Sequence, residues 1–417
     1  MTRRRRRSAA GRAVLTTVTA FGVLAGTASA VAAPAAAPPA VAAPADRRIA
    51  PGVTYRQFDI DARAGEARAH LLTVDLANPH VRVDLLYPGA VAARATVSQL
   101  ADSAGAVAGV NGDFFHITET QHPGVQATGA TVGPAIAAGH VLKAAVPGGQ
   151  RFGPALPPGT STQDVFGVGA DRRARLDRLS LAGTVGTPDG RLALKGLNQY
   201  ALPVNSVGAF TAKWGSASRA RAVCGTDTQR SAPCSDETYE VKVRAGRVAS
   251  VAGAPGSGAI PADTTVLVGR EEGARQLRTL SVGDPVHVRR SLVAASSGVP
   301  YTFAIGGFPV LRGGAPLSGL DDVTSAVRTA VGYKGGGQQL LLLALDGAAD
   351  HRGGLTVAEE ADTMRSLGAS AAFNLDGGGS TELVTRATGA GAVSVRNHPS
   401  GGAERPVPNG IGVFSTG

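Results

Sequence analysis

The chain of 417 residues lacks the features that mark several large classes of protein. It has 2 cysteines, and no apolar run after its first thirty residues is long and uncharged enough to span a bilayer. Its basic residues are scattered, without the interleaved aromatic side chains that are typical of a nucleic-acid surface. We therefore expect neither a stable membrane span nor a nucleic-acid partner.

Glycine and proline, in contrast, are abundant. The sequence holds 57 glycines and 25 prolines, which favours many turns and short strands over a helical bundle. With 43% hydrophobic residues, a chain of this length can bury a large core. The predicted fold is α+β, with a mixed sheet core, short helices and a β-rich insertion.

The first residues are typical of an export signal. A basic stretch with six arginines precedes an apolar run over residues 13–25, and Ala28-Ser-Ala30 suits a signal peptidase. We assign residues 1–30 to a signal peptide and 31–52 to an Ala/Pro-rich linker, and expect a secreted or cell-surface protein. Loss of the six arginines lowers the formal net charge from +10 to +4.

The two cysteines, Cys224 and Cys234, flank a short polar segment rich in turn-forming residues. In an exported protein, cysteines this close favour a disulfide that closes a surface loop. No histidine lies near them in the sequence, so a zinc centre is not expected. No metal site is predicted elsewhere from histidine spacing.

The texture of the sequence changes twice along the chain. Residues 53–134 contain alternating strand patterns, residues 135–298 contain short strand-like pieces between turns, and residues 299–417 return to longer apolar runs. We interpret 53–134 and 299–417 as one catalytic core, and 135–298 as a β-rich insertion or second lobe.

Residues 374–381 form the most distinctive motif. The run Asn374-Leu-Asp-Gly-Gly-Gly-Ser-Thr381 places a carboxylate, three glycines and two hydroxyls directly after a mostly apolar segment. Consecutive glycines let backbone N–H groups face an anion, and Asp376 would then lie beside that anion. The ending Gly-Lys-Ser/Thr of a nucleotide-binding loop is absent.

Two segments of the proposed core resemble each other. Thr96-Val-Ser-Gln99 and Thr356-Val-Ala-Glu359 each have the pattern of a capping box that opens a helix. Each is followed by an apolar strand pattern that ends in Asn-x-Asp, at Asn111 and at Asn374. If both strands enter one sheet in the same direction, the two Asn-x-Asp pairs lie together at one edge.

Six motifs occur in the order that is typical of the phosphodiester glycosidase family, which the chain resembles over roughly residues 95–134 and 300–415. They are Asn111-Gly-Asp-Phe-Phe115, Gly306-Gly-Phe-Pro-Val-Leu311, Arg328-Thr-Ala-Val-Gly332, Leu343-Ala-Leu-Asp-Gly347, the run 374–381, and Arg405-Pro-Val-Pro-Asn-Gly-Ile-Gly-Val413. The resemblance implies a hydrolase that cleaves the C1–O bond of a sugar 1-phosphodiester, carried by a glycan or glycolipid.

This chemistry suits the residues of the motifs. Asp376 is the first choice for the carboxylate that attacks the anomeric carbon or activates water, with Asp113 as the second acid. Arg328 is the first choice for a bidentate phosphate clamp and Arg405 the second. Further candidates for contacts with the phosphate or the sugar are Asn111, Asn374, Gly377, Gly378, Gly379, Ser380 and Thr381.

Other assignments stay open in the sequence. Asp113, Asp346 and Asp376 could all be turn residues, and Glu359 is fully explained by its capping box, although both Asp346 and Glu359 remain catalytic candidates. His116 and His122 could transfer protons or lie exposed in a loop. No cofactor is expected, but the three aspartates could alternatively hold a cation such as calcium. A metal-dependent phosphoesterase and a non-catalytic glycan-binding protein are the alternative functions.

Overall fold

The computed structural model describes residues 46–416. The signal peptide predicted for residues 1–30 lies outside this range, as does most of the linker predicted for 31–52. Within that linker, Arg47–Ala50 forms strand β1, which pairs with β2, so the linker prediction is wrong from Arg47 onward. None of the helices in the described range is long and apolar enough to cross a membrane.

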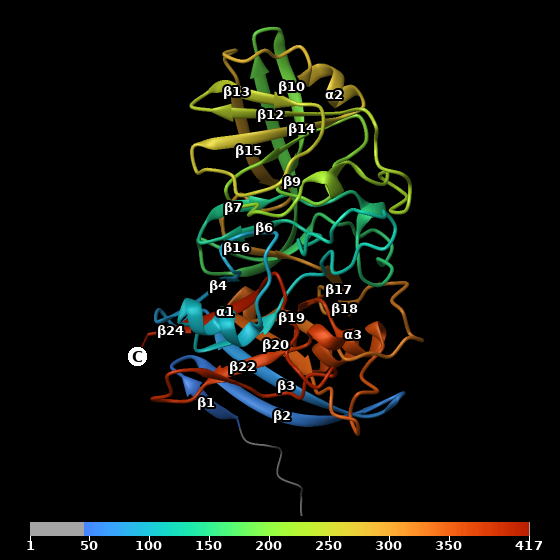
Figure 1. Cartoon of the computed structure of the whole chain (residues 1–417). Coiled ribbons are helices and arrows are strands. Elements are labelled where there is room, and N and C mark those ends of the chain that lie inside the picture. The colour runs from blue at the N-terminus through green and yellow to red at the C-terminus, as the bar shows by residue number, and fades with distance from the viewer. Residues whose placement is uncertain (1–45, 417) are drawn as a thin grey trace, which may run out of the picture. The chain divides into compact units, whose positions relative to one another are not determined.

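Strands predominate, so the α+β prediction overstated the helices (Figure 1). The helices are α1 (Val97–Ala104), α2 (Glu272–Leu277) and α3 (Val357–Ser366), with 3-10 turns at Gly148–Gln150, Ala220–Val223, Gly335–Gly337 and Gly378–Ser380. The strands form three sheets, and the described strand pairs are antiparallel except for β10 with β11.

The first sheet joins the two ends of the described chain. Its order is β1 (Arg47–Ala50), β2 (Val53–Ala62), β3 (Gly65–Asp75), β20 (Gln339–Leu345), β19 (Thr329–Lys334), β21 (Ala371–Asn374), β17 (Phe308–Arg312) and β18 (Ala315–Pro316). The early strand β3 pairs along its length with the late strand β20, and Figure 1 shows the blue and orange ribbons side by side. The leucines of β20 are buried on both faces, which places this strand in the centre of the core.

The second sheet also combines early and late segments. Its order is β23 (Val393–Val395), β22 (Leu383–Arg386), β5 (Ala108–Asn111), β24 (Gly410–Ser415) and β4 (Val81–Leu86). Its residues Val110 and Ile411 belong to the same hydrophobic core as Leu342 and Phe373 of the first sheet. The two sheets therefore share one continuous core.

The third sheet is built mostly from the middle of the chain, but it also contains β16 from the segment 299–417. Its order is β13 (Arg247–Ala252), β12 (Thr238–Arg244), β14 (Thr264–Arg270), β11 (Val207–Phe210), β10 (Gly190–Leu197), β9 (Ala174–Thr187), β8 (Asp164–Gly169), β16 (Tyr301–Gly306), β6 (Ala135–Ala137) and β7 (His140–Lys143), with β15 (His287–Ala294) paired to β9. A second hydrophobic cluster, which includes Val185, Leu194, Val241 and Leu267, lies within it.

Both predicted capping boxes are present. Thr96 accepts from the Gln99 backbone and Thr356 from the Glu359 backbone, and both side chains at the third helical position bond back to their cap. Each helix leads to a short strand that ends in asparagine, at Asn111 in β5 and at Asn374 in β21. The two strands belong to different sheets, so the condition of a single shared sheet is not met.

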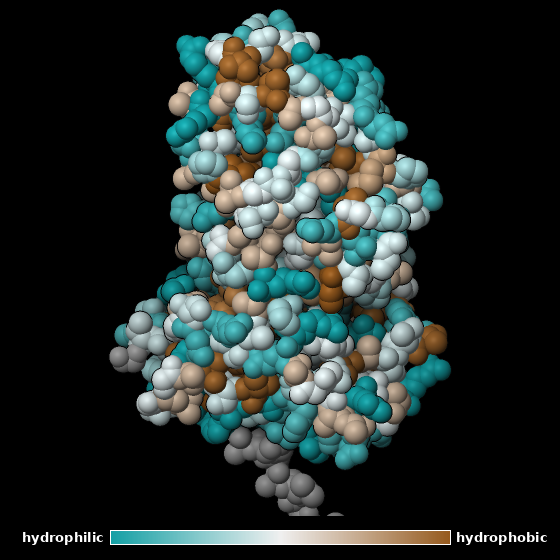
Figure 2. Space-filling model, viewed as in Figure 1, coloured by the Kyte–Doolittle hydropathy of each residue, from teal (hydrophilic) through white to brown (hydrophobic). Residues whose placement is uncertain are grey.

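The visible surface is polar with small, separated apolar groups (Figure 2). Within the described range, four large hydrophobic side chains are exposed, those of Val251, Val282, Val293 and Val323. This is the scattered distribution expected of a protein surface without a dominant apolar patch.

Candidate active site

The ends of β5 and β21 meet although they come from different sheets. The backbone N–H of Asp376 donates to the carbonyl of Gly112 at 2.8 Å. The Asn111 amide donates to the Asp376 carbonyl at 2.7 Å, while its oxygen accepts from Thr329 Oγ1 at 2.7 Å and from the Glu382 N–H at 3.1 Å. Asn111 therefore joins three segments and fixes the backbone at Asp376.

Asp113 is enclosed between Gly133 and Gly306. It is 2% exposed, its Oδ2 accepts from the Gly133 N–H at 2.7 Å, and its own N–H donates to Asn409 Oδ1 at 3.0 Å. Its Oδ1 has no hydrogen-bond partner among the described residues. Burial raises the pKa of Asp113 to about 6, against the charges of Lys143 and Arg151, which favour the ionised form.

Asp376 lies at the start of the glycine loop, residues 377–379, and is more accessible than Asp113. Burial raises its pKa to about 6, and a hydrogen bond from Ser380, the charge of Arg405 and the Gly377 N–H oppose that rise. The Arg405 guanidinium in turn donates to Ser380 Oγ at 3.3 Å. Arg405, Ser380 and Asp376 thus form one connected polar chain, and the charge of Asp376 also raises the pKa of Asp113.

The glycine loop has fewer free backbone donors than its sequence suggests. The N–H of Gly377 donates to Asp376 Oδ1 at 3.0 Å, and that of Gly378 to the Val327 carbonyl at 2.7 Å. Ser380 and Thr381 N–H groups close the following turn. Among the described residues, Gly379 is the loop glycine whose N–H has no hydrogen-bond partner. The expected anion site with three free glycine N–H donors is therefore not preformed.

The guanidinium that lies at this loop is that of Arg405, whereas Arg328 approaches the loop with its backbone only. A Cβ added to Gly379 would come within 2.6 Å of the Arg405 Cζ, so the guanidinium packs directly against this glycine. Arg328 donates instead to the carbonyls of Leu355 at 2.9 Å and Thr324 at 2.8 Å. Adjacent strand residues point to opposite faces, and since Thr329 points toward Asn111, Arg328 points away from it. The structure thus gives Arg328 a role in the scaffold.

Arg328 also faces a buried acid that the sequence did not suggest. Glu360 on α3 is fully buried, neither of its carboxylate oxygens has a partner among the described residues, and burial raises its pKa to about 8 against the charge of Arg328. Its neighbour Glu359 uses both oxygens, one for the Thr356 N–H and one for the Arg63 N–H. The capping role of Glu359 is confirmed, and nothing in its contacts indicates catalysis.

Two further predicted residues have buried polar atoms without partners. Both side-chain atoms of Asn374 and the Oγ1 of Thr381 are buried and unpaired within the described range. The next residue, Glu382, has a pKa raised to about 9 by burial and by its hydrogen bond with Glu404. Unpaired polar atoms are costly in a folded core, so Asn374 and Thr381 have hydrogen-bonding capacity that a substrate or water could use.

Asp346 belongs to a different cluster. Its carboxylate contacts His70 Nε2 at 3.1 Å and His398 Nδ1 at 3.0 Å, and accepts from the Ala348 N–H at 2.7 Å. Burial favours a higher pKa for Asp346, but these bonds, with that of His398 first, hold the pKa below its usual value. His70 continues the cluster to Tyr55 at 2.8 Å.

His116 and His122 are buried, so the expectation that loop histidines lie exposed was wrong. His116 contacts Glu119 Oε2 at 3.0 Å and His122 contacts Glu119 Oε1 at 3.2 Å, while Arg221 binds the same carboxylate. Burial and the charge of Arg221 lower the pKa of His116 to about 4. A histidine that stays neutral at ordinary pH is a weak proton donor, which argues against an acid role for His116.

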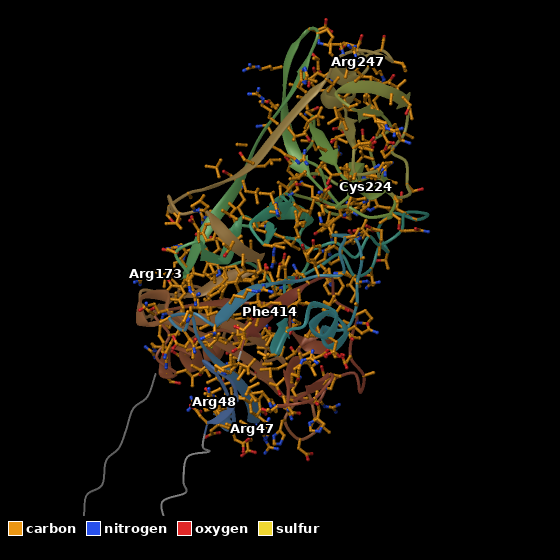
Figure 3. The ribbon with its side chains drawn as sticks, turned by 90° about the vertical axis from the view of Figure 1, so that its left-hand side faces the viewer. Arg47, Arg48, Arg173, Cys224, Arg247 and Phe414 are labelled. Carbon is orange, nitrogen blue, oxygen red and sulfur yellow. A yellow bond between two sulfur atoms is a disulfide. The ribbon has the colours of Figure 1, made fainter. Side chains whose placement is uncertain are left out.

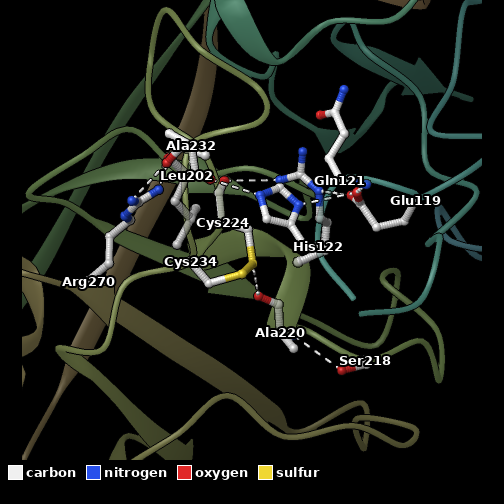
Figure 4. Close-up of a disulfide and its surroundings, with 12 residues drawn as sticks. Glu119, Gln121, His122, Leu202, Ser218, Ala220, Cys224, Ala232, Cys234 and Arg270 are labelled. Carbon is white, nitrogen blue, oxygen red and sulfur yellow. Dashed lines mark hydrogen bonds and ion pairs between the residues drawn. A yellow bond between two sulfur atoms is a disulfide. The ribbon is translucent and has the colours of Figure 1, made fainter. Parts of the chain in front are cut away.

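The predicted disulfide between Cys224 and Cys234 is present and borders this histidine cluster (Figure 4). Figure 3 shows that Cys224 lies apart from Phe414, which belongs to β24 in the second sheet. In the described part of the chain, His122 and the two cysteines are the set of three potential ligands close enough to share a metal ion, but both sulfurs are in the disulfide. Asp113, Asp346 and Asp376 do not form such a set there.

The candidate site is a partly accessible loop beside a buried acid, and it does not coincide with a cavity found elsewhere in the described residues. A cavity of about 670 Å³ is lined by residues around 144–148, 160–163 and 179–181, and by neither Asp113 nor Asp376. Asp376 and the loop glycines 377–379 are partly exposed, whereas Asn374, Ser380 and Thr381 beside them are buried.

Several residues around Asp113 were missed from the sequence. Lys143 and Arg151 come from the middle segment, Gly133 lies at the end of residues 53–134, and Asn409 was quoted in a motif without a role. A lysine within an apolar segment, Ala137 to Val146, was the available signal for Lys143. Nothing local marked Arg151, because its approach to Asp113 depends on how distant segments pack.

Comparison with known families gives one match. Residues 237–414 match the phosphodiester glycosidase family. The match includes Asp376 and Arg405 but begins inside the segment interpreted as an insertion, and it leaves Asn111 and Asp113 outside. No curated protein matches the chain.

Solved structures show the same fold at low sequence identity. A hypothetical protein from Synechocystis has a TM-score of 0.66 and 20% identity, over 88% of this chain and 62% of that protein, so the chain spans less than two thirds of it. A putative exported protein from Burkholderia pseudomallei has a TM-score of 0.64 and 23% identity, over 84% of this chain and 74% of that one.

A third structure is more distant. The zebrafish N-acetylglucosamine-1-phosphodiester alpha-N-acetylglucosaminidase catalytic domain, auto-inhibited by its pro-peptide, has a TM-score of 0.43 and 16% identity, over 88% of this chain and 84% of that one. The family match, which does not depend on this likeness, confirms the resemblance indicated by the order of the motifs. Residues 237–414, somewhat less than half of the chain, are thus similar to the phosphodiester glycosidase family of hydrolases.

Proposed function

We propose that the protein is an exported glycosidase that cleaves the C1–O bond of a sugar 1-phosphodiester. The observation that carries the proposal is the approach of Asp113 and Asp376 from two different sheets, each with its pKa raised to about 6, beside Arg405. Two carboxyl groups whose pKa values are both raised to about 6 can supply one ionised and one protonated partner near neutral pH.

The reaction needs little from a general acid. As the C1–O bond breaks, the anomeric carbon gains oxocarbenium character, and a phosphate monoester leaves more easily than an alcohol does. Asp376, the more accessible acid, is the carboxylate that attacks this carbon or activates water, and Asp113 is the second acid of the pair. Asn374 and Thr381 supply hydrogen bonds to the bound substrate.

Arg405 provides the positive charge for the substrate phosphate. Its guanidinium lies against Gly379, whose N–H is the uncommitted backbone donor of the loop, so charge and donor are adjacent. The expected signal peptide would bring the enzyme to glycans or glycolipids outside the cytoplasm. Their identity is to be determined with a panel of sugar 1-phosphodiesters.

Hydrolysis in oxygen-18 water tests the bond that is cut. We expect the label in the released sugar, because the phosphate leaves with its bridging oxygen and an oxygen atom from water bonds to C1 in its place. Label in the phosphate would mean P–O cleavage and would favour a metal-dependent phosphoesterase. Measurable affinity without turnover across the panel would instead indicate a glycan-binding protein.

A further inference from the structure

Lys143, the last residue of β7, is a buried lysine with no carboxylate in direct contact. It is 1% exposed, and its ammonium donates to the carbonyls of Ala144 at 2.7 Å, Val132 at 3.2 Å and Gly133. Burial lowers its pKa to about 7, with Asp113 acting in the opposite direction. Burying an ammonium is costly, so its position beside the candidate site calls for a reason.

One peptide group connects Lys143 to Asp113. The carbonyl of Val132 accepts from Lys143, and the N–H of the same peptide, which belongs to Gly133, donates to Asp113 Oδ2 at 2.7 Å. A cation at the oxygen of a peptide draws electron density toward it and makes the N–H a stronger donor. A stronger donor favours the ionised form of the carboxyl group that accepts from it.

We propose that Lys143 is a positioning residue for Asp113, which acts through the Val132–Gly133 peptide. Its charge holds the Gly133 N–H toward Asp113 Oδ2 and stabilises the carboxylate. The inference rests on the proposed function only in giving Asp113 a part in turnover; the link between the two side chains stands on the hydrogen bonds alone.

The other charged groups around Asp113 differ from Lys143 in how they act. Arg151 also stabilises the ionised form through its charge, while Asp376 opposes it. Tyr200 senses the charge of Asp113 but has a pKa raised far above neutral by burial, so it stays protonated. The Val132 carbonyl also accepts from the neutral backbone N–H of Val146 at 3.0 Å, so Lys143 is, among these charged groups, the one that bonds to the peptide that binds Asp113.

The test compares Lys143→Gln with Lys143→Met in the whole protein. Gln keeps N–H donors for the carbonyls but removes the charge, whereas Met removes both. If Lys143 had a purely structural role, its replacement by Gln would leave the pKa of Asp113 unchanged. Lys195→Gln is the matched control, because Lys195 is exposed on β10 and undergoes the same chemical change.

The main readout is the pKa of Asp113, followed by carbon-13 NMR of side-chain carboxyl groups and assigned with Asp113→Asn. In Lys143→Gln we expect this pKa to rise by about one unit or more, the range for loss of a nearby opposite charge, with no change in Lys195→Gln. Thermal melts monitored by circular dichroism establish that each variant is folded. If Lys143→Met does not fold, Lys143→Gln carries the test.

The second readout is the pH dependence of kcat/KM on a substrate identified from the panel. The limb controlled by Asp113 should move to higher pH in Lys143→Gln by the same amount as the NMR value. An unchanged Asp113 pKa in the folded variant would overturn the proposal. If no sugar 1-phosphodiester is hydrolysed, the proposed function fails, but the NMR titration still decides the role of Lys143.

Discussion

Gly306 gives the most direct test of where Asp113 must lie. A Cβ added at this position would come within 2.6 Å of the Gly133 Cα and 2.8 Å of the Asp113 Cγ. Non-bonded carbons need about 3.5 Å, so Gly306→Ala forces the Asp113 side chain or its supporting glycine to move by nearly 1 Å. Asp113 cannot retain both its bond to Gly133 and its position relative to Asp376.

The expected cost appears in both stability and turnover. Overpacking of this kind lowers the free energy of unfolding by about 1–3 kcal/mol. A displacement of about 1 Å at a reacting group can reduce the rate about 100-fold. We therefore expect kcat/KM on a sugar 1-phosphodiester to fall by about two orders of magnitude at a temperature well below the melting point.

Gly298→Ala is the matched control. Gly298 is exposed, has no atom within 4 Å of the added Cβ and does not have a left-handed backbone conformation, so we expect wild-type activity. The measurements are initial rates over a range of substrate concentrations and thermal melts of the three proteins. Wild-type kcat/KM and stability in Gly306→Ala would show that turnover does not depend on the position of Asp113 and would refute the reasoning.

Further predictions follow from the same contacts. Asp376→Asn should abolish hydrolysis but keep the fold. Because the folded-state pKa of Asp376, about 6, exceeds the ordinary value of 3.8, its ionisation costs stability as pH rises between these values. The melting temperature of Asp376→Asn should therefore equal or exceed that of the wild type above pH 6, with the difference lost below about pH 4. If the melting temperature of the variant, relative to that of the wild type, is lower at pH 7 than at pH 4, this reasoning is contradicted. Arg405→Ala should weaken turnover of charged phosphodiesters more than that of a neutral aryl glycoside; equal effects on both substrates would count against a phosphate contact. Arg328→Lys should mainly lower the free energy of unfolding, by about 1–3 kcal/mol, because the hydrogen bonds to two carbonyls are lost. Replacement of Cys224 and Cys234 by serine should lower the free energy of unfolding by roughly 2–3 kcal/mol, measured by urea denaturation against the oxidised wild type, and an unchanged midpoint would refute it.

Features that depend on neighbouring residues were predictable. The capping boxes at Thr96 and Thr356 satisfy helix N-terminal N–H groups within one turn, so their patterns need no knowledge of the fold. The disulfide likewise follows from two cysteines separated by 10 positions. The polar ends of β5 and β21 were also predictable, because each family motif there directly follows an apolar strand in the sequence.

Features that depend on distant segments were not predictable. Whether Arg328 points toward or away from the site depends on which face of β19 meets Asn111, and that is set by the packing of two sheets. Lys143 approaches Asp113 only because β7 lies near the segment of Gly133. His116 was expected to be exposed, but Glu119 and Arg221 bury it in a cluster that spans more than a hundred positions.

The division of the acids between two sheets has a consequence for how the site keeps its geometry. Asp113 is held by the N–H of Gly133 and the side chain of Asn409, whereas Asp376 is held at its backbone by Gly112 and Asn111. Among the described residues, the hydrogen bonds between the strand that leads to Asp113 and the loop that carries Asp376 are those of Gly112 and Asn111. Asn111 also binds the β19 and β22 segments, so its position is fixed from both sheets. The separation of the two carboxylates therefore depends on how the two sheets pack against each other.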